Sequence, residues 1–236
     1  MTSHEFVDAD LSGALFREVD LTGARMYGVV LSNADIDGAI DGLRVNGVEV
    51  APLIEAELDR LHPERLALRP TTPDELRTAL DVWDELWRPT VARAVALGEE
   101  ASHTRVNNEW SFVETRRHII FVVDGWFNAA VLGDPLAFHP IGLPASFIPD
   151  DGSFGLDSTA QPSLAEVEEV LAVRTERLRE YAATVTQAEL DRVPPTNPIW
   201  SSAAGRTAIN CVRVVFGDGW EHHRFAVRDL SALEAS

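Results

Sequence analysis

The sequence has little cysteine and little positive charge. Cys211 is the one cysteine among 236 residues, so no disulfide can form within the chain. It lies in an apolar run, where a thiol is more often a small buried side chain than a nucleophile. The 20 basic residues face 38 acidic ones, which gives a formal charge of -18. This balance excludes general affinity for nucleic acid, because phosphate binding needs clustered lysine and arginine. Binding to a partner with a basic surface is compatible with this charge.

Long apolar runs are also missing. The N-terminal MTSHEFVDAD is acidic and lacks the apolar core of a signal peptide. No later stretch reaches the roughly 18 apolar residues that a membrane span needs. With the single cysteine, these absences lead us to expect a soluble, cytoplasmic protein that does not associate with membranes. A hydrophobic content of 45% fits a folded chain. The length of 236 residues fits one full domain with a smaller module, or one large domain.

The N-terminus has a five-residue period. Large apolar residues recur at every fifth position, and a small residue stands two positions before each of the later ones. The large residues are Phe6, Leu11, Phe16, Leu21, Met26, Leu31 and Ile36, and the small ones are Ala9, Ala14, Val19, Ala24, Val29 and Ala34. An α-helix cannot keep this period on one face, because it turns once in about 3.6 residues. A coil with four short sides can keep it.

This pattern, FVDAD, LSGAL, FREVD, LTGAR, MYGVV, LSNAD and IDGAI, resembles the pentapeptide-repeat family. Members of that family form right-handed, four-sided β-solenoids with four repeats in each coil. The resemblance covers about residues 6–40 and implies fewer than two coils, which is too little stacking to be stable alone. We therefore expect this segment, within a first domain of residues 1–50, to pack against the rest of the chain or against a second copy in a homodimer.

Residues 51–236 change in character and predict a second, helical domain. Asn46-Gly47, between short apolar runs, first predicts a tight hairpin turn. Helices are expected over about residues 52–61, 72–97, 111–132, 163–193 and 207–233, with a start at Asn108 as an alternative for the third and a break near Thr186 in the fourth. Capping-box patterns begin three of them. The Gly-, Pro- and Phe-rich residues 133–162 predict a long loop. Four long helices with one long crossover predict a bundle, and bundle cores often hold metal sites.

The stretch GDGWEHH in the last predicted helix carries the candidate site. Asp218 and His222 are four residues apart, so they project from one face of a helix and could ligate one ion. His118 is a third candidate, because it lies in the apolar run RHIIFVVDGWF, where an imidazole has little other reason to be. One carboxylate and two imidazoles suit zinc, nickel or ferrous iron and leave a coordination position open. On spacing alone, solvated side chains are the alternative.

The stretches EWSFVETRRHIIFVVDGWF, FHPIGLP and WEHHRFAVRDL resemble the DinB-like superfamily, in the actinobacterial form with a preceding pentapeptide-repeat segment. The resemblance covers nearly the whole chain and implies a mainly α protein whose four-helix bundle binds a divalent metal. The implied ligands, a histidine on the second helix and an acid–histidine pair on the last, fall on His118, Asp218 and His222. Relatives usually carry glutamate where this chain has Asp218 and Gly219. The shorter acid, and glycines at 217 and 219, put the working state of the site in doubt.

Four further residues are candidates for the surroundings of the site. Glu114, one turn before His118, could accept the proton of the free ring nitrogen, with helix capping as the alternative. His139 could close over the site from the long loop or serve as a turn residue. Trp220 could line a pocket or belong to the core. His223 points about 100° away from His222, so it is expected at the surface or behind the ligands.

The resemblance implies an enzyme, a metal-dependent transferase or isomerase that uses a low-molecular-weight thiol such as mycothiol on a small electrophile. The cofactors would be a divalent metal, zinc first and nickel or iron as alternatives, and that thiol. A metal-dependent hydrolase would use the same residues. A non-catalytic protein that binds a small molecule or a partner, with a degenerate metal site, is the other alternative. DNA mimicry by the acidic repeats is disfavoured, because the repeat segment is short.

Overall fold

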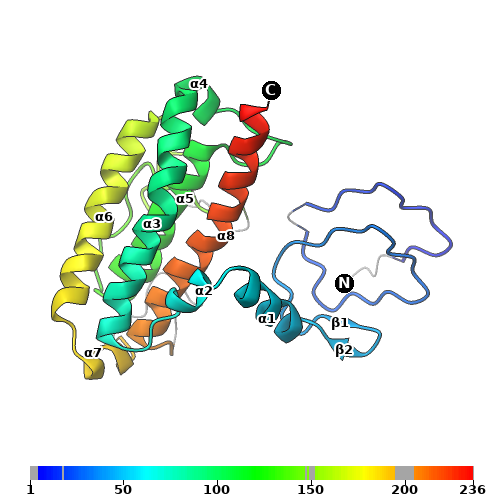
Figure 1. Cartoon of the computed structure of the whole chain (residues 1–236), viewed down its shortest axis with the longest axis horizontal. Helices are drawn as coiled ribbons and strands as arrows, with labels where there is room; N and C mark the ends of the chain where they lie inside the picture. The colour runs from blue at the N-terminus through cyan, green and yellow to red at the C-terminus, as the bar shows by residue number, and fades with distance from the viewer. Residues whose placement is uncertain (1–4, 18, 147, 149–151, 195–204, 236) are drawn as a thin grey trace. The chain divides into compact units, whose positions relative to one another are not determined.

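The chain divides into a short repeat unit and a larger helical unit. The computed structural model describes residues 5–17, 19–146, 148, 152–194 and 205–235. Contacts between backbone positions group the chain into Met1–Ala39 and Ile40–Ser236 (Figure 1). The end of the repeats and the predicted hairpin therefore belong with the helices in space. The division at residue 50, which describes a change in sequence character, stays a prediction.

The repeat unit turns at ten-residue intervals. Gly13, Gly23 and Asn33 take positive φ angles of 73°, 75° and 62°. At each of these turns the N–H of an alanine donates to the carbonyl of the leucine three positions earlier, over 2.9–3.1 Å. Asp10 and Asp20 also accept the N–H two residues on, as short polar side chains do in turns. The five-residue pattern thus produces regular corners, and the trace winds as a coil (Figure 1).

The β-ladder of a solenoid is not shown in the repeat unit. Within residues 5–17 and 19–43 no strand is assigned, and every described residue of the unit is exposed except Arg17, which is half-buried. The sides of a solenoid coil pair with the coils above and below, and a unit as short as this one leaves few such pairs. Taken by itself, the repeat unit has corners but no buried apolar core.

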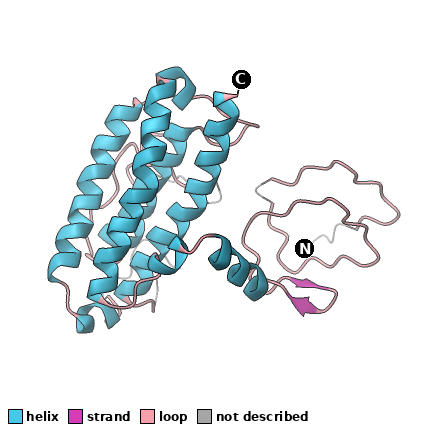
Figure 2. Cartoon of the chain, viewed as in Figure 1, coloured by secondary structure: helices cyan, strands magenta, loops and turns pink. Residues whose placement is uncertain are grey.

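The helical unit begins with the predicted hairpin. β1 (Arg44–Val45) pairs antiparallel with β2 (Val48–Glu49) (Figure 2). The two turn residues, Asn46 and Gly47, have φ angles of 50° and 83°, as a two-residue turn that follows the strand twist requires. This prediction is confirmed.

Four long helices form the bundle. They are α3 (Pro73–Leu97), α5 (Phe112–Val123), α6 (Leu164–Thr184) and α8 (Ala208–Glu234). α3 and α5 each pack against both α6 and α8, so the four surround one common core (Figure 1). The shorter helices are α1 (Ala51–Leu61), α2 (Glu64–Ala67), α4 (Glu99–Ser102) and α7 (Gln187–Asp191). The chain is therefore mainly helical, as predicted.

The helix starts follow the local sequence. Thr72, Ser111 and Ser163 each accept the N–H of a glutamate three residues on, and that glutamate accepts the N–H of the cap in return. A fourth capping box at Thr186 begins α7 and accounts for the predicted break. These boxes satisfy backbone donors that a helix start leaves free.

The end of the second long helix differs from the prediction of a helix through residue 132. After Val123 the turns widen into a π-helix, η1 (Asp124–Ala129). Asp124 is fully buried there and accepts hydrogen bonds from Asn128 Nδ2, the His139 backbone N–H and Arg174 Nε, at 2.8, 2.9 and 3.2 Å. These partners come from the long loop and α6 as well as from η1, so tertiary contacts decide this segment.

Candidate metal centre

Three predicted ligands meet between α5 and α8. His118, Asp218 and His222 each offer one ligand atom, and these atoms all lie within 4.8 Å of one another. Asp218 Oδ2 is 3.5 Å from His118 Nε2 and 3.7 Å from His222 Nε2. Two atoms that bind one tetrahedral zinc ion at about 2.0–2.2 Å lie roughly 3.3–3.6 Å apart. The carboxylate of Asp218, although shorter than that of glutamate, reaches the position that such a ligand needs.

The free oxygen of Asp218 fits a cation. Oδ2 is buried and has no hydrogen-bond partner among the residues that the structure describes, which is rare for a buried polar atom. Burial raises the pKa of Asp218, but its interactions with His118 and His222 outweigh this and hold the pKa below its ordinary value. The side chain is therefore ionised, and a buried anionic oxygen that lies 3.5 and 3.7 Å from two imidazole nitrogens suits a metal ion.

His222 is uncharged under ordinary conditions. Burial lowers its pKa to about 4, against the attraction of the Asp218 carboxylate, which acts in the opposite direction. At neutral pH the imidazole therefore keeps a lone pair available, as a metal ligand must.

The long loop orients His118. His118 Nδ1 lies 2.9 Å from the carbonyl oxygen of Leu143. A carbonyl can only accept, so Nδ1 carries the proton and the neutral ring has its lone pair on Nε2, which faces Asp218. Sequence reasoning missed this partner, because a backbone carbonyl in a loop leaves no signature in the residue types.

Glu114 takes the capping role rather than the role beside His118. Its carboxylate forms an ion pair with Arg105 and accepts the Ser111 N–H at 2.8 Å. Burial raises its pKa, but these partners together hold the pKa below its ordinary value. The group that binds His118 is Leu143 instead.

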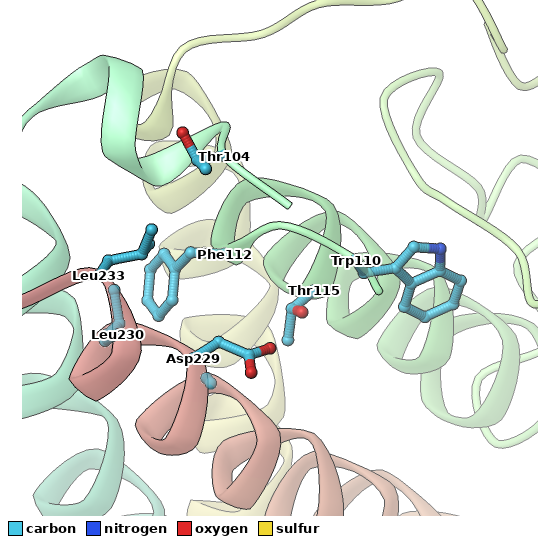
Figure 3. Close-up of a pocket in the computed structure, with 8 residues that line it drawn as sticks. Thr104, Trp110, Phe112, Thr115, Asp229, Leu230 and Leu233 are labelled. Atoms are coloured by element: carbon cyan, nitrogen blue, oxygen red, sulfur yellow. The ribbon is translucent and has the colours of Figure 1, made fainter. Parts of the chain in front are cut away.

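Trp110 stands beside both imidazoles, directly before the cap of α5. Its ring centroid is 4.8 Å from that of His118 and 5.7 Å from that of His222, and it is nearly parallel to the second, at 22°. Trp110 also lines a small pocket between the start of α5 and the last turns of α8 (Figure 3). The other lining residues are Thr104, Phe112, Thr115, Ala226, Asp229, Leu230 and Leu233. One aromatic side chain thus connects the candidate ligands with a hollow that is mainly apolar.

Two of the predicted surrounding residues lie on other faces of α8. Trp220 is buried, donates from Nε1 to Glu64 Oε1 at 3.4 Å, and lies under the guanidinium of Arg65 at 4.5 Å. His223 Nε2 lies 3.1 Å from the Leu86 carbonyl oxygen and 2.9 Å from Thr90 Oγ1. Trp220 therefore follows the core alternative, and His223 is held by α3.

His139 follows the turn alternative. Its Nδ1 accepts the N–H of Ile141 at 3.3 Å, and its own N–H donates to buried Asp124. It is not among the residues whose ligand atoms come together. The loop reaches the site through Leu143 instead.

The two glycines of GDGWEHH have different surroundings. A β-carbon at Gly219 would lie 1.8 Å from Trp83 Cη2, so the indole of α3 occupies the space of a side chain. A β-carbon at Gly217 would meet nothing within 4 Å. α8 is continuous across both positions. The glycine at 219 is thus required by close packing.

The fold and the site define a helical bundle with a candidate His–Asp–His metal centre. The chain belongs to the DinB superfamily, whose family model matches residues 82–226, and it carries pentapeptide repeats in eight copies over residues 5–40. Both family predictions are confirmed. No curated protein and no solved structure matches the chain significantly. Among the described residues, no helix is long and apolar enough to cross a membrane.

Proposed function

We propose that the chain is a metal-dependent enzyme that uses a low-molecular-weight thiol to transfer sulfur to a small electrophile or to isomerise it. His118, Asp218 and His222 hold the ion. Zinc is preferred to nickel or iron, because three protein ligands of nitrogen and oxygen with one open position are typical of catalytic zinc sites. The observation that carries the proposal is the convergence of three ligand atoms within 4.8 Å around a buried, unpartnered carboxylate oxygen.

The site divides the work between the cofactors and the chain. A bound zinc ion would supply an open position at which the sulfur of a small thiol is held as its thiolate. The sulfur has to come from outside, because Cys211 is buried and burial raises the pKa of its thiol. The chain keeps His118 in one tautomer through the Leu143 carbonyl and contributes the charge of Asp218.

Elemental analysis of the purified protein tests the metal site. We expect one zinc ion per chain in the wild type, and loss of the ion in Asp218→Ala and His222→Ala. His223→Ala is the matched control, because it removes the adjacent imidazole, which faces α3, and should keep the ion. A wild type without stoichiometric metal would contradict the proposal and favour a non-catalytic protein that binds a small molecule or a partner.

The thiol requires a separate experiment. The zinc-loaded protein is incubated with a generic electrophile, with and without a small thiol such as mycothiol. We expect product only when the thiol is present, and no product from the His222→Ala variant. Equal turnover without thiol would contradict the transferase proposal and favour a metal-dependent hydrolase, which would use the same three residues.

We further propose that residues 5–40 form a right-handed, four-sided β-solenoid in a homodimer. The corners at ten-residue intervals support the coil, and the lack of any buried residue within 5–17 and 19–39 supports the need for a covering partner. A second copy suits this need, because two ends with the same five-residue spacing can stack in register. Sedimentation of the full chain should show a dimer at micromolar concentration, and Leu21→Glu should yield a monomer. A wild-type monomer would contradict the dimer.

A further inference from the structure

Arg117 fastens the long loop to α5. Its side chain is 6% exposed; Nε donates to the Ile141 carbonyl at 2.8 Å and Nη1 to the Ala160 carbonyl at 3.1 Å. The Asp157 N–H donates to the Pro140 carbonyl at 2.8 Å, which joins the same two parts of the loop. One guanidinium therefore fixes an early and a late part of the loop against the helix that carries His118.

Aromatic and backbone contacts press the same loop against α5. Phe121, one turn after Arg117, has its ring centroid 5.2 Å from Phe138 and 5.6 Å from Phe154. At Gly142 the loop is in contact with the helix, because a β-carbon there would lie at an ordinary contact distance of 3.5 Å from Phe121 Cβ and at a tight 3.2 Å from the His139 carbonyl oxygen. The residue after Gly142 therefore has a defined distance from the helix.

That next residue is Leu143, which contacts two consecutive residues of α5. Its N–H donates to the Arg117 carbonyl at 3.1 Å, and its carbonyl accepts from His118 Nδ1 at 2.9 Å. Consecutive side chains on a helix point about 100° apart, so Arg117 can hold the loop while His118 reaches across to α8. The guanidinium thus holds Ile141, and Leu143, two residues further along the loop, holds the imidazole.

The neighbouring Arg116 shows what an ordinary buried arginine does in this helix. It forms a two-point ion pair with Glu168 of α6 at 2.5 and 2.8 Å and lies over Trp87. Arg117 instead donates to two carbonyls. Each guanidinium also keeps one buried nitrogen, Arg116 Nη1 and Arg117 Nη2, that has no hydrogen bond to the residues that the structure describes. Burying a charge is costly unless it is well compensated, so Arg117 does not have the form of a simple stabilising contact.

We propose that Arg117 is a positioning residue for the metal ligand His118. By fixing the loop at Ile141 and Ala160, it holds the Leu143 carbonyl where it accepts from Nδ1 and keeps the lone pair of His118 on Nε2. The proposal rests on the proposed metal site and assigns the loop a role in it. Without the hydrogen bonds of Arg117 to the loop, the His118 ring can rotate and place its proton on Nε2. Loss of a group that orients a metal-binding histidine typically weakens metal binding about 10- to 100-fold.

Zinc affinity in two matched variants tests the proposal. A competition titration of the full chain with a chromophoric chelator is compared for Arg117→Met and Arg116→Met, which remove adjacent buried charges from the same helix. We expect affinity to fall about 10- to 100-fold in the first and to change less than about threefold in the second, although both lower the melting temperature. Arg117→Lys, which can still donate to one carbonyl, should lie in between. Wild-type affinity in a folded Arg117→Met would overturn the proposal.

A second variant covers the case in which Arg117→Met fails to fold. Gly142→Val leaves α5 unchanged and crowds the His139 carbonyl oxygen, 3.2 Å from the added β-carbon, in the turn just before Leu143. It should therefore displace the Leu143 carbonyl and weaken zinc binding in the same direction. Nitrogen NMR of the metal-free protein reads the His118 tautomer directly: Nδ1–H is expected in the wild type, and a mixture in Gly142→Val. An Nε2–H tautomer in the wild type, or an unchanged tautomer in the variant, would overturn the inference. A wild type that binds no zinc would overturn the proposed function, while the tautomer would still decide the role of the loop.

Discussion

Two faces of α8 within GDGWEHH differ in how their polar groups are satisfied. On the face toward α5, the Nε2 atoms of His118 and His222 lie 3.5 and 3.7 Å from Asp218 Oδ2. This oxygen has no hydrogen bond to any described residue. On the face toward α3, Gly219 packs under the ring of Trp83, and His223 contacts the Leu86 carbonyl and Thr90. The first face leaves an acceptor unsatisfied, whereas the second pairs the Nε2 atom of its histidine and fills its space.

Within one turn of α8, the face toward α5 is therefore suited to binding an ion, and the face toward α3 stabilises the fold. An unpartnered buried carboxylate and a desolvated imidazole cost free energy of folding in the absence of an ion. The face toward α3 offsets this cost with close packing and satisfied hydrogen bonds. Adjacent residues with the same chemistry, such as His222 and His223, therefore have different tasks because they point to different neighbours.

The largest effect on stability is expected from Gly219→Ala. The added carbon would lie 1.8 Å from Trp83 Cη2, and the ring has to move out of the core. We expect a loss of about 3 kcal/mol or more in the free energy of unfolding, the upper range for overpacking. Urea denaturation measures it, and Trp83→Leu in the same chain should restore part of the loss. An unchanged unfolding midpoint in Gly219→Ala would contradict the packing of the α3 face.

The second-largest effect on stability is expected from acid, which protonates His222 on the face of α8 toward α5. The pKa of His222 is about 4 in the folded chain and about 6.5 when unfolded, so the unfolded state binds more protons between these values. The stability that this group contributes is present above about pH 6.5 and is lost as the pH falls toward 4, by roughly 3 kcal/mol.

Urea denaturation of the metal-free protein across this range measures the acid effect. His222→Gln is the control, because it removes this group and keeps the others that titrate in acid. The wild type should lose more stability than the variant between about pH 7 and pH 4. Parallel pH curves for the two proteins would contradict the prediction.

His223→Ala should separate the two faces. The change removes the contacts of Nε2 with Leu86 and Thr90 and the edge contact with Trp87 at 5.0 Å. We expect a loss of about 1–2 kcal/mol in the free energy of unfolding, with zinc affinity unchanged. Thermal unfolding and a zinc titration on the same sample check both. A large loss of zinc affinity would show that the two faces are not independent.

Gly217→Ala should produce the smallest effect, with the opposite sign. Because a β-carbon there meets nothing within 4 Å, alanine adds helix propensity without a clash. We expect up to about 1 kcal/mol of additional stability, seen as a higher melting temperature. A destabilised variant would mean that the turn before Asp218 needs the freedom of glycine.

Much of the local structure could be predicted from the residues. The capping boxes at Thr72, Ser111 and Ser163 begin helices, and Asn46-Gly47 forms the hairpin turn. The candidate ligand trio was assembled from four-residue spacing, from a histidine in an apolar run, and from the resemblance to the DinB-like superfamily. The caps, the hairpin turn and the Asp218–His222 pair depend on neighbours within one or two helical turns, so the sequence pattern contains them, whereas the place of His118 beside that pair is implied by the resemblance.

Other features could not be predicted, because their partners are distant in the chain. The π-helix after Val123 depends on contacts of Asp124 with the loop and α6. The role of Glu114 was left open, and the structure decides it by bringing Arg105 to its carboxylate. From helix propensity alone, Gly219 is predicted to weaken α8, whereas in the structure its missing side chain makes room for the indole of Trp83.

The sequence by itself determined where helices begin, that the N-terminus repeats its apolar residues every five positions, and which side chains of α8 share a face. These are local consequences of capping, periodicity and helical geometry. Only the tertiary structure decided that the Leu143 carbonyl holds His118, that Trp83 fills the space at Gly219, and that His223 faces α3. Each of these contacts joins segments brought together by packing, and packing depends on the whole core rather than on any one stretch of residues.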